Sequence, residues 1–246
     1  PIGRMWVGTF HSLAHRLLRT HPVEANLSPT FQILDAQDQF RIVKRLMKDN
    51  GIDETKFPIK KVQWFINQQK DEGILPHQID AGYNFFVKQS TKVFDLYEKH
   101  CQANDLVDFA GLLVKSYELL KNNQSLLDHY QKKFRHILVD EFQDTNRVQY
   151  QFIKILHNQS NHVFCVGDDD QSIYGWRGAR IENIQKIESD FKPIEVIKLE
   201  QNYRSTGNIL SASNALIANN QNRLEKSLWT DSGDGDLVNV FNARSE

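Results

Sequence analysis

Cysteine and long apolar runs are scarce in this sequence of 246 residues. Its two cysteines, Cys101 and Cys165, lie far apart and in no metal-ligand spacing, so they support neither a disulfide scaffold nor a zinc site, and a reducing cytoplasm is the expected compartment. No run of about 18 apolar residues occurs, which predicts no membrane span. The first residues also lack the apolar stretch of a signal peptide.

An excess of charge of one sign is also missing, because the formal net charge is -1. Bulk charge therefore indicates neither a nucleic acid nor a membrane as partner. The apolar fraction of 40% and the charged fraction of 25% exclude wholesale disorder and a collagen-like chain, and the length suits one or two domains. The chain begins without methionine, from which we expect a piece of a longer chain.

The first half of the chain is helical in pattern. From about 34 to 133, apolar residues recur at helical spacing, as in Phe40, Val43 and Met47 after the expected N-cap Asp35. An earlier helix is expected after residues 5–9, which are strand-like, with Ser12 as its N-cap.

From 135 onward, short apolar runs alternate with helical segments. The runs at 137–139, 163–166 and 196–199 predict parallel strands buried on both faces, and 237–241 predicts the start of another. The sequence thus predicts an α/β domain into which an all-helical block is inserted.

Asp140 and Glu141 directly follow the first of these runs. Carboxylates at that edge of a parallel sheet suit nucleotide hydrolysis, in which one holds Mg²⁺ through water and the next orients or deprotonates the attacking water. The alternative is a solvated strand end, with Asp144 or Thr145 capping the next helix.

A glycine-punctuated loop at 166–178 carries acids, an amide and aromatic rings. Tyr174 and Trp176 beside Arg177 suit base stacking on a single strand, and Gln171 could bond a phosphate or the attacking water. The alternative is a turn whose two aromatic rings fill the core.

Tyr203 and Arg204 mark the third motif, between the last apolar run and a helix from about 207. An arginine there can reach a neighbouring phosphate, and the tyrosine can stack on a base. The alternative is a helix cap with a surface arginine.

Together these motifs resemble those of the superfamily 1A DNA helicases in order and spacing. They are Asp-Glu-Phe-Gln-Asp at 140–144, Gly-Asp-Asp-Asp-Gln-Ser-Ile-Tyr-Gly-Trp-Arg-Gly at 167–178 and Gln-Asn-Tyr-Arg-Ser at 201–205. Gly-Thr-Phe-His-Ser at 8–12 resembles the family's early DNA-contacting motif. The likeness also includes 13–19, 69–73, 107–109 and 228–231, and so covers essentially the whole chain.

The resemblance implies an α/β fold: part of a RecA-like P-loop NTPase parallel sheet with a large all-helical accessory insertion. Residues 1–9 would hold a strand of the first motor domain, and 10–134 the accessory insertion. Residues 135–200 would complete the first motor domain, and 201–246 would begin the second.

The resemblance also assigns roles in ATP hydrolysis. Asp140 would be the Mg²⁺-associated carboxylate and Glu141 the catalytic base. Gln171 would sense the γ-phosphate, Tyr203 would stack on adenine, and Arg204 would reach the γ-phosphate.

On the DNA side, the resemblance places Phe10 and His11 along the DNA path. Tyr174 and Trp176 would contact bases, and Arg177 would support their loop. The implied activity is ATP-driven movement from 3′ to 5′ on single-stranded DNA, with unwinding of duplex in repair. The implied cofactors are ATP and Mg²⁺. The implied partners are single-stranded DNA, its junctions with duplex, and DNA repair proteins. The implied location is the bacterial cytoplasm, at the nucleoid.

One family motif is missing, since no Gly-x-x-x-x-Gly-Lys-[Ser/Thr] loop occurs in the 246 residues. That loop cradles the phosphates. We therefore expect a central fragment that also lacks the later C-terminal motifs, binds nucleotide weakly or not at all, and does not hydrolyse ATP by itself.

Two other functions stay open. The chain could be a non-catalytic module that binds single-stranded DNA, or a metal-dependent nuclease whose clustered acids hold Mg²⁺. His11 and His15 have a metal-capable spacing, but no third ligand is evident.

Overall fold

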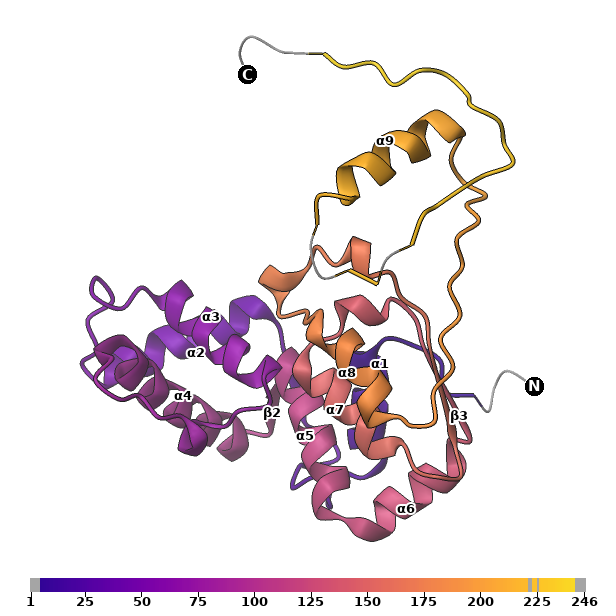
Figure 1. Cartoon of the computed structure of the whole chain (residues 1–246). Coiled ribbons are helices and arrows are strands. Elements are labelled where there is room, and N and C mark those ends of the chain that lie inside the picture. Colours follow the sequence, from indigo (N-terminus) through magenta and orange to yellow (C-terminus); the bar gives the residue numbers. More distant parts are fainter. Residues whose placement is uncertain (1–4, 221–222, 225, 242–246) are drawn as a thin grey trace.

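The computed structural model describes residues 5–220, 223–224 and 226–241. Its helices gather into two bodies, with a further helix carried above them on an extended segment (Figure 1). The α-helices are α1 (Phe10–Thr20), α2 (Ala36–Asp49), α3 (Ile59–Asp71), α4 (Phe85–Ala103), α5 (Phe109–Asn122), α6 (Gln124–Lys133), α7 (Arg147–Leu156), α8 (Glu182–Asp190) and α9 (Gly207–Ile217). The strands are β1 (Gln32–Leu34), β2 (Leu106–Asp108), β3 (His136–Val139) and β4 (His162–Cys165).

Helices α2, α3 and α4 form a lobe with its own hydrophobic core, seen on the left of Figure 1. Asp35 caps α2 as predicted, since its carboxylate accepts from the backbone N–H groups of Gln37 and Asp38 at 2.8 and 2.7 Å. Val43 and Met47 then lie on the buried stripe of the helix. The helical pattern of this region is confirmed.

A short parallel sheet joins this lobe to the rest of the chain. Strand β1 pairs with β2 in the register Gln32↔Leu106, Ile33↔Val107 and Leu34↔Asp108. The sequence predicted only helices here. Strands of three residues are too short to show an alternating pattern, and their pairing joins segments that lie far apart in the sequence.

A second core lies between α1, α5, α6 and α7. Helix α1 begins one turn earlier than expected: Thr9 is its N-cap and accepts from Ser12 N at 3.3 Å, so Ser12 is not the cap. Leu17 and Leu18 of α1 are buried against Leu112 and Leu113 of α5. Helices α1, α5 and α6 thus share a core with α7, while the expected boundary at 134 stays a prediction.

Strands β3 and β4 pair in parallel, as predicted, with Val139 opposite Cys165. One face packs in a third core with Phe142, Tyr150 and Phe191. On the other face Leu138 is 74% exposed and Phe164 60% exposed, so the expected burial of both faces is not found. The sequence could not show this, because a run of apolar side chains has the same pattern whether or not a second layer covers it.

Three expected strands are absent from the described residues. Segments 5–9, 196–199 and 237–241 have no strand assignment. A strand exists only where a neighbouring strand pairs with its backbone groups, and among the described residues the ladder in this region joins only β3 and β4. The segment after α8 instead runs extended toward α9 and makes one parallel bridge, Gln201↔Trp229.

The fold class is confirmed: a mixed α/β structure with short parallel sheets and many helices. Among the residues that the structure describes, no helix combines the length and apolar character needed to cross a lipid bilayer.

Candidate functional site

Asp140 and Glu141 lie at the carboxyl end of β3, where the chain leaves the sheet. Both are exposed, whereas Val139 just before them is buried. Glu141 has a φ of 51°, a left-handed conformation that non-glycine residues seldom adopt, and its backbone N–H donates to Asp140 Oδ1 at 3.0 Å. The turn therefore directs two adjacent carboxylates away from the core at a backbone cost of about 1 kcal/mol.

A cavity of about 950 Å³ opens beside this turn. Asp140, Glu141 and Asp144 line it together with apolar side chains such as Trp6 and Leu138. Burial and the charge of Glu141 raise the pKa of Asp144, whose buried Oδ1 has no hydrogen-bond partner among the described residues. Carboxylate oxygens are the ligands that Mg²⁺ prefers, so the donor set fits a magnesium ion held at Asp140.

The helix after the turn has its own cap. Asn146 accepts from Gln149 N at 2.9 Å while Gln149 Oε1 accepts from Asn146 N at 2.9 Å, which forms a capping box at α7. Neither Asp144 nor Thr145 caps α7, so the alternative explanation of the acidic motif as a helix cap is wrong. Thr145 instead donates its hydroxyl to Phe142 O at 2.8 Å.

Gln143 is a residue that the sequence did not single out. It is 1% exposed, its Nε2 donates to Glu141 Oε2 at 2.6 Å, and its Oε1 accepts from Asp168 N at 3.0 Å. The only signal available beforehand was its place inside the acidic motif. In the folded chain it joins the Asp140–Glu141 turn to the loop after β4.

Gln171 lies in that same loop and contacts Asp168. It is exposed, and its Nε2 donates to Asp168 Oδ2 at 2.6 Å. The structure therefore connects Gln171 to Glu141 through Asp168 and Gln143. The shared part of Gln171 and Glu141 in one nucleotide site stays a prediction.

Tyr174 and Trp176 lie further along the loop, with ring centroids 6.4 Å apart. Trp176 is 74% exposed, so it does not fill the core, and that alternative is wrong for this residue. An exposed indole beside a second ring is a surface on which a base can stack. Arg177 ends the short 3₁₀ helix Gly175–Arg177, and its side chain lies outside the described part of the structure.

Phe10 and His11 occupy the first turn of α1. Phe10 is half-buried and packs against two of the cores, whereas the rings of His11 and Phe109 form a T-shaped pair with centroids 6.0 Å apart. Burial lowers the pKa of His11, which favours its neutral form. Phe109 is 53% exposed and was not predicted as a site residue, because its ring looks like ordinary core from sequence alone.

His15 does not join His11 in a metal site. Its Nε2 accepts from Arg19 Nε at 2.9 Å, and its ring forms a T-shaped pair with Phe31.

The carboxyl end of α3 is tied to this region by charged side chains. Asn146 Nδ2 donates to Asp71 Oδ1 at 2.9 Å, and Arg180 pairs with Glu72 at 2.6 Å. Gly178 lies beside Asp71, since an added Cβ would be in ordinary van der Waals contact with Asp71 Cβ at 3.5 Å. Burial, with the neighbouring charge of Glu72, raises the pKa of Asp71 to about 6.

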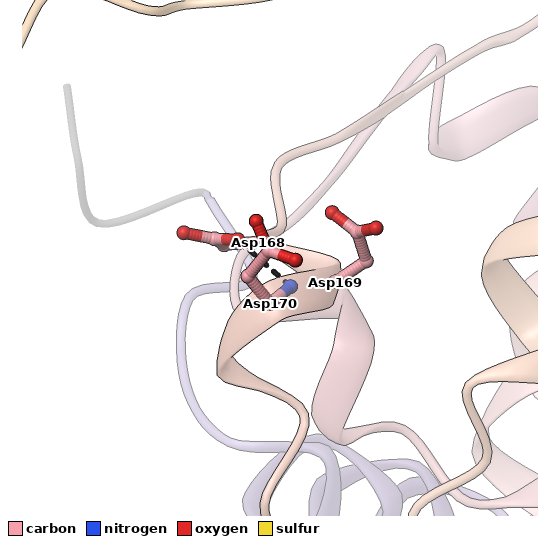
Figure 2. A group of neighbouring side chains, drawn as sticks. All are labelled: Asp168, Asp169 and Asp170. Carbon is pink, nitrogen blue, oxygen red and sulfur yellow. Dashed lines mark hydrogen bonds between the residues drawn. The ribbon is translucent and has the colours of Figure 1, made fainter. Parts of the chain in front are cut away.

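Asp168, Asp169 and Asp170 are grouped at one turn, where Asp170 N donates to Asp168 Oδ1 at 3.0 Å (Figure 2). Their carboxylates already have cationic partners. Arg223 pairs with Asp170 at 2.6 Å. Lys226 pairs with Asp168 and also with Asp169, at 3.2 Å from its Nζ to Asp169 Oδ1. These ion pairs compensate the acidic charge, so the cluster is better explained as a contact with the segment after α9 than as a metal site.

Tyr203 and Arg204 lie in the chain between the extended segment after α8 and helix α9. Both are exposed, Tyr203 donates its hydroxyl to Gln201 Oε1 at 2.7 Å, and Arg204 N donates to Asn202 Oδ1 at 2.8 Å. Across the described ranges, no hydrogen bond joins either residue to Asp140, Glu141 or Gln171. Their expected part in a nucleotide site stays a prediction.

Residues 1–192 match the UvrD/REP helicase N-terminal domain, and residues 197–246 match the UvrD-like helicase C-terminal domain. The chain therefore belongs to the UvrD/REP helicase family, which confirms the resemblance found in the motifs.

Individual relatives agree with this assignment. DNA helicase II of Escherichia coli is 54% identical over 244 residues, which are 99% of this chain and 34% of that protein. DNA helicase II of Haemophilus influenzae is 53% identical over 98% of this chain and 33% of that protein. ATP-dependent DNA helicase PcrA of Staphylococcus epidermidis is 38% identical, again over 98% of this chain and 33% of that protein. The chain thus spans about one third of the length of the curated relatives it matches.

Proposed function

We propose that this chain forms the nucleotide-hydrolysis and DNA-contact region of an ATP-driven motor that moves 3′ to 5′ on single-stranded DNA and unwinds duplex in repair. One observation carries the proposal. Asp140 and Glu141 are exposed at the carboxyl end of β3, at the mouth of a cavity, in a chain of the UvrD/REP helicase family. The carboxyl edge of a parallel sheet is where α/β proteins bind nucleotides.

The chemistry assigned to this edge is hydrolysis of the terminal phosphate of ATP. Glu141 orients a water and takes its proton as the oxygen attacks the γ-phosphorus and the bond to the bridging oxygen of ADP breaks. Asp140 holds Mg²⁺ through water. When bound, the ion neutralises charge on the phosphates. Gln171 senses the γ-phosphate, Arg204 reaches it, and Tyr203 stacks on adenine.

The DNA-contact surface in this proposal is aromatic. Trp176 and Tyr174 stack on bases, with Arg177 supporting their loop, and His11 with Phe10 lies along the same path. Exposed rings bind any base sequence, because every base has a flat face. This suits a motor that must move along DNA irrespective of its sequence.

Single-stranded DNA and its junctions with duplex are the proposed DNA partners, and DNA repair proteins the proposed protein partners. We place the protein in the bacterial cytoplasm, at the nucleoid. The phosphate-binding loop of the family is not among the 246 residues, so we also propose that this chain alone does not hydrolyse ATP. Turnover by the isolated chain that is stimulated by DNA would contradict this last point.

The test is ATP hydrolysis by the full-length gene product, with and without single-stranded DNA. We expect strong stimulation by DNA and a loss of about 10²–10⁴-fold in kcat for Glu141→Gln, since the variant cannot accept the proton. Glu54→Gln is the matched control, because Glu54 is an exposed carboxylate in the distant lobe. Undiminished turnover in Glu141→Gln would show that Glu141 is not the catalytic base.

The exposed rings favour a second candidate, a module that binds single-stranded DNA without turnover. Binding of an oligonucleotide by a folded full-length protein that shows no stimulated hydrolysis would establish it. Cleavage of the oligonucleotide in Mg²⁺ without ATP would instead indicate a nuclease.

A further inference from the structure

Gln143 lies between the two functional motifs, and both ends of its side-chain amide are used. Nε2 donates to Glu141 Oε2 at 2.6 Å, and Oε1 accepts from the backbone N–H of Asp168 at 3.0 Å. Gln143 is 1% exposed, so its amide depends on these two protein partners rather than on water. A buried amide held at both ends has one orientation only.

The ends of β3 and β4 fix the position of this amide. Phe142 N donates to Val166 O at 2.9 Å and Val166 N donates to Val139 O at 2.8 Å, which continues the pairing past the strands. Gly167 then passes so close that an added Cβ would stand 2.9 Å from Gln143 Oε1 and 3.3 Å from Phe142 Cβ. A side chain at 167 would displace the amide, so glycine is needed there for the contact to exist.

The contact continues from Asp168 into the aromatic loop. The Asp168 carboxylate accepts from Gln171 Nε2 at 2.6 Å and pairs with Lys226, and Trp176 follows a few residues later. A hydrogen-bonded path therefore runs from the Glu141 carboxylate through Gln143 to the segment that carries the exposed ring. Any displacement of the loop backbone at Asp168 acts directly on the amide that holds Glu141.

We propose that Gln143 is a positioning residue that holds the Glu141 carboxylate in one orientation and couples it to the loop of Gln171 and Trp176. The proposal rests on the proposed function, since it takes Glu141 as the base. Glu141 is exposed on a left-handed turn, and Gln143 donates the hydrogen bond that the structure shows at its carboxylate. Without that bond the carboxylate is free to rotate, and a shift of about 1 Å can reduce a rate about 100-fold.

The test uses the full-length gene product and two substitutions. Gln143→Leu removes both hydrogen bonds at similar size, whereas Gln143→Glu keeps the shape and the acceptor for Asp168 N but replaces the donor to Glu141 with a repelling carboxylate. Gln131→Ala is the control, because Gln131 is a half-buried amide that donates to Ile155 O at 2.8 Å and makes no hydrogen bond to Glu141 among the described residues. For each variant, kcat, the KM for ATP, the Kd for single-stranded DNA and the unfolding midpoint are measured.

We expect kcat in the presence of DNA to fall about 10–100-fold in both Gln143 variants, with KM and the Kd for DNA within about twofold of the parent. The ratio of DNA-stimulated to basal hydrolysis should fall as well. A purely structural role would lower the unfolding midpoint and reduce both rates in proportion, leaving that ratio unchanged. Only a coupling role reduces the ratio in a folded protein.

Several results would overturn the proposal. One is a parental kcat and stimulation ratio in folded Gln143→Glu. Unfolding of both Gln143 variants, with Gln131→Ala folded, would show that Gln143 maintains the fold rather than the orientation of Glu141. Both results leave the proposed function standing if Glu141→Gln is inactive, whereas an active Glu141→Gln would refute the proposed function itself.

Discussion

The α2–α4 lobe and the β3–β4 region use the same kinds of charged residues in opposite ways. In the lobe, Lys70 is 3% exposed and pairs with Asp108 at 2.8 Å and with Glu98 at 2.5 Å, while Tyr97 donates its hydroxyl to Asp108 at 2.7 Å. At the end of β3, the carboxylates of Asp140 and Glu141 are exposed beside a cavity.

The difference lies in what compensates each charge. Burial by itself would raise the pKa of Asp108, but the Lys70 ammonium outweighs it and holds that pKa below its ordinary value. Burial would also lower the pKa of Lys70, and the two carboxylates reverse this and raise it. Charges that compensate each other inside the protein maintain the fold, whereas carboxylates that face a cavity stay available to a ligand.

The largest effect is expected at the buried lysine. Lys70→Met should lower the free energy of unfolding by about 3–5 kcal/mol, because it leaves the Asp108 carboxylate buried without its cation. Denaturant unfolding of the variant measures this. Lys44→Met on the exposed side of α2 is the control and should change stability by less than about 0.5 kcal/mol. Equal losses of unfolding free energy in Lys70→Met and Lys44→Met would contradict the role of the buried ion pair in maintaining the fold.

On the functional side, Trp176→Ala should weaken binding of single-stranded DNA by about 1–3 kcal/mol, the usual worth of one base stacked on an aromatic ring. Stability should hardly change, because the indole is 74% exposed. Fluorescence anisotropy with a labelled oligonucleotide measures the affinity of the full-length protein. Trp64→Ala is the control, since Trp64 is a 59% exposed tryptophan in the lobe. Loss of stability without loss of affinity would make Trp176 a structural residue.

A smaller effect, which depends on pH, is expected where the two regions meet. The pKa of Asp71 is raised from 3.8 to about 6, so the folded state holds the proton more tightly than the unfolded state does. Its contribution to stability is therefore most favourable below pH 3.8 and is lost as the pH rises through about 6.

Asp71→Asn removes this charge while its Oδ1 can still accept from Asn146. Relative to the parent, the variant should be about 1 kcal/mol more stable at about pH 8, and this advantage should disappear at about pH 4. Thermal unfolding at the two pH values measures the difference. If the stability advantage of Asp71→Asn grew as the pH was lowered, the pH dependence would have the opposite sign. That result would refute a raised pKa at Asp71.

The smallest effect is expected at an exposed ion pair of the lobe. Lys99 and Asp95 are 2.6 Å apart on α4, one helical turn from each other and open to solvent. Lys99→Ala should cost about 0.3–0.5 kcal/mol, which is measured by denaturant unfolding in low salt. A loss as large as that of Lys70→Met would mean that burial is not what separates the two lysines.

Much of the fold and of the site could be predicted locally. The cap at Asp35, the helices of the lobe and the strand that ends before Asp140 all follow from patterns within a few neighbouring residues. Sequence alone placed Gln143 and Phe109 inside the motifs but assigned no role to either, because an amide inside an acidic motif and a ring in an apolar helix have ordinary explanations. Their contacts depend on what lies opposite them in the folded chain: Asp168 N for Gln143 and His11 for Phe109.

The sequence by itself determined most helical segments, the two apolar strands β3 and β4, the order of the motifs and the family, because these depend on residue types at short separations. Only the tertiary structure decided that β1 pairs with β2, that one face of β3 and β4 stays exposed, and that Glu141, Gln143 and Asp168 form one path. These features join atoms far apart in the chain. No local pattern encodes such contacts, since the free energy that selects them comes from packing and pairing in the folded molecule.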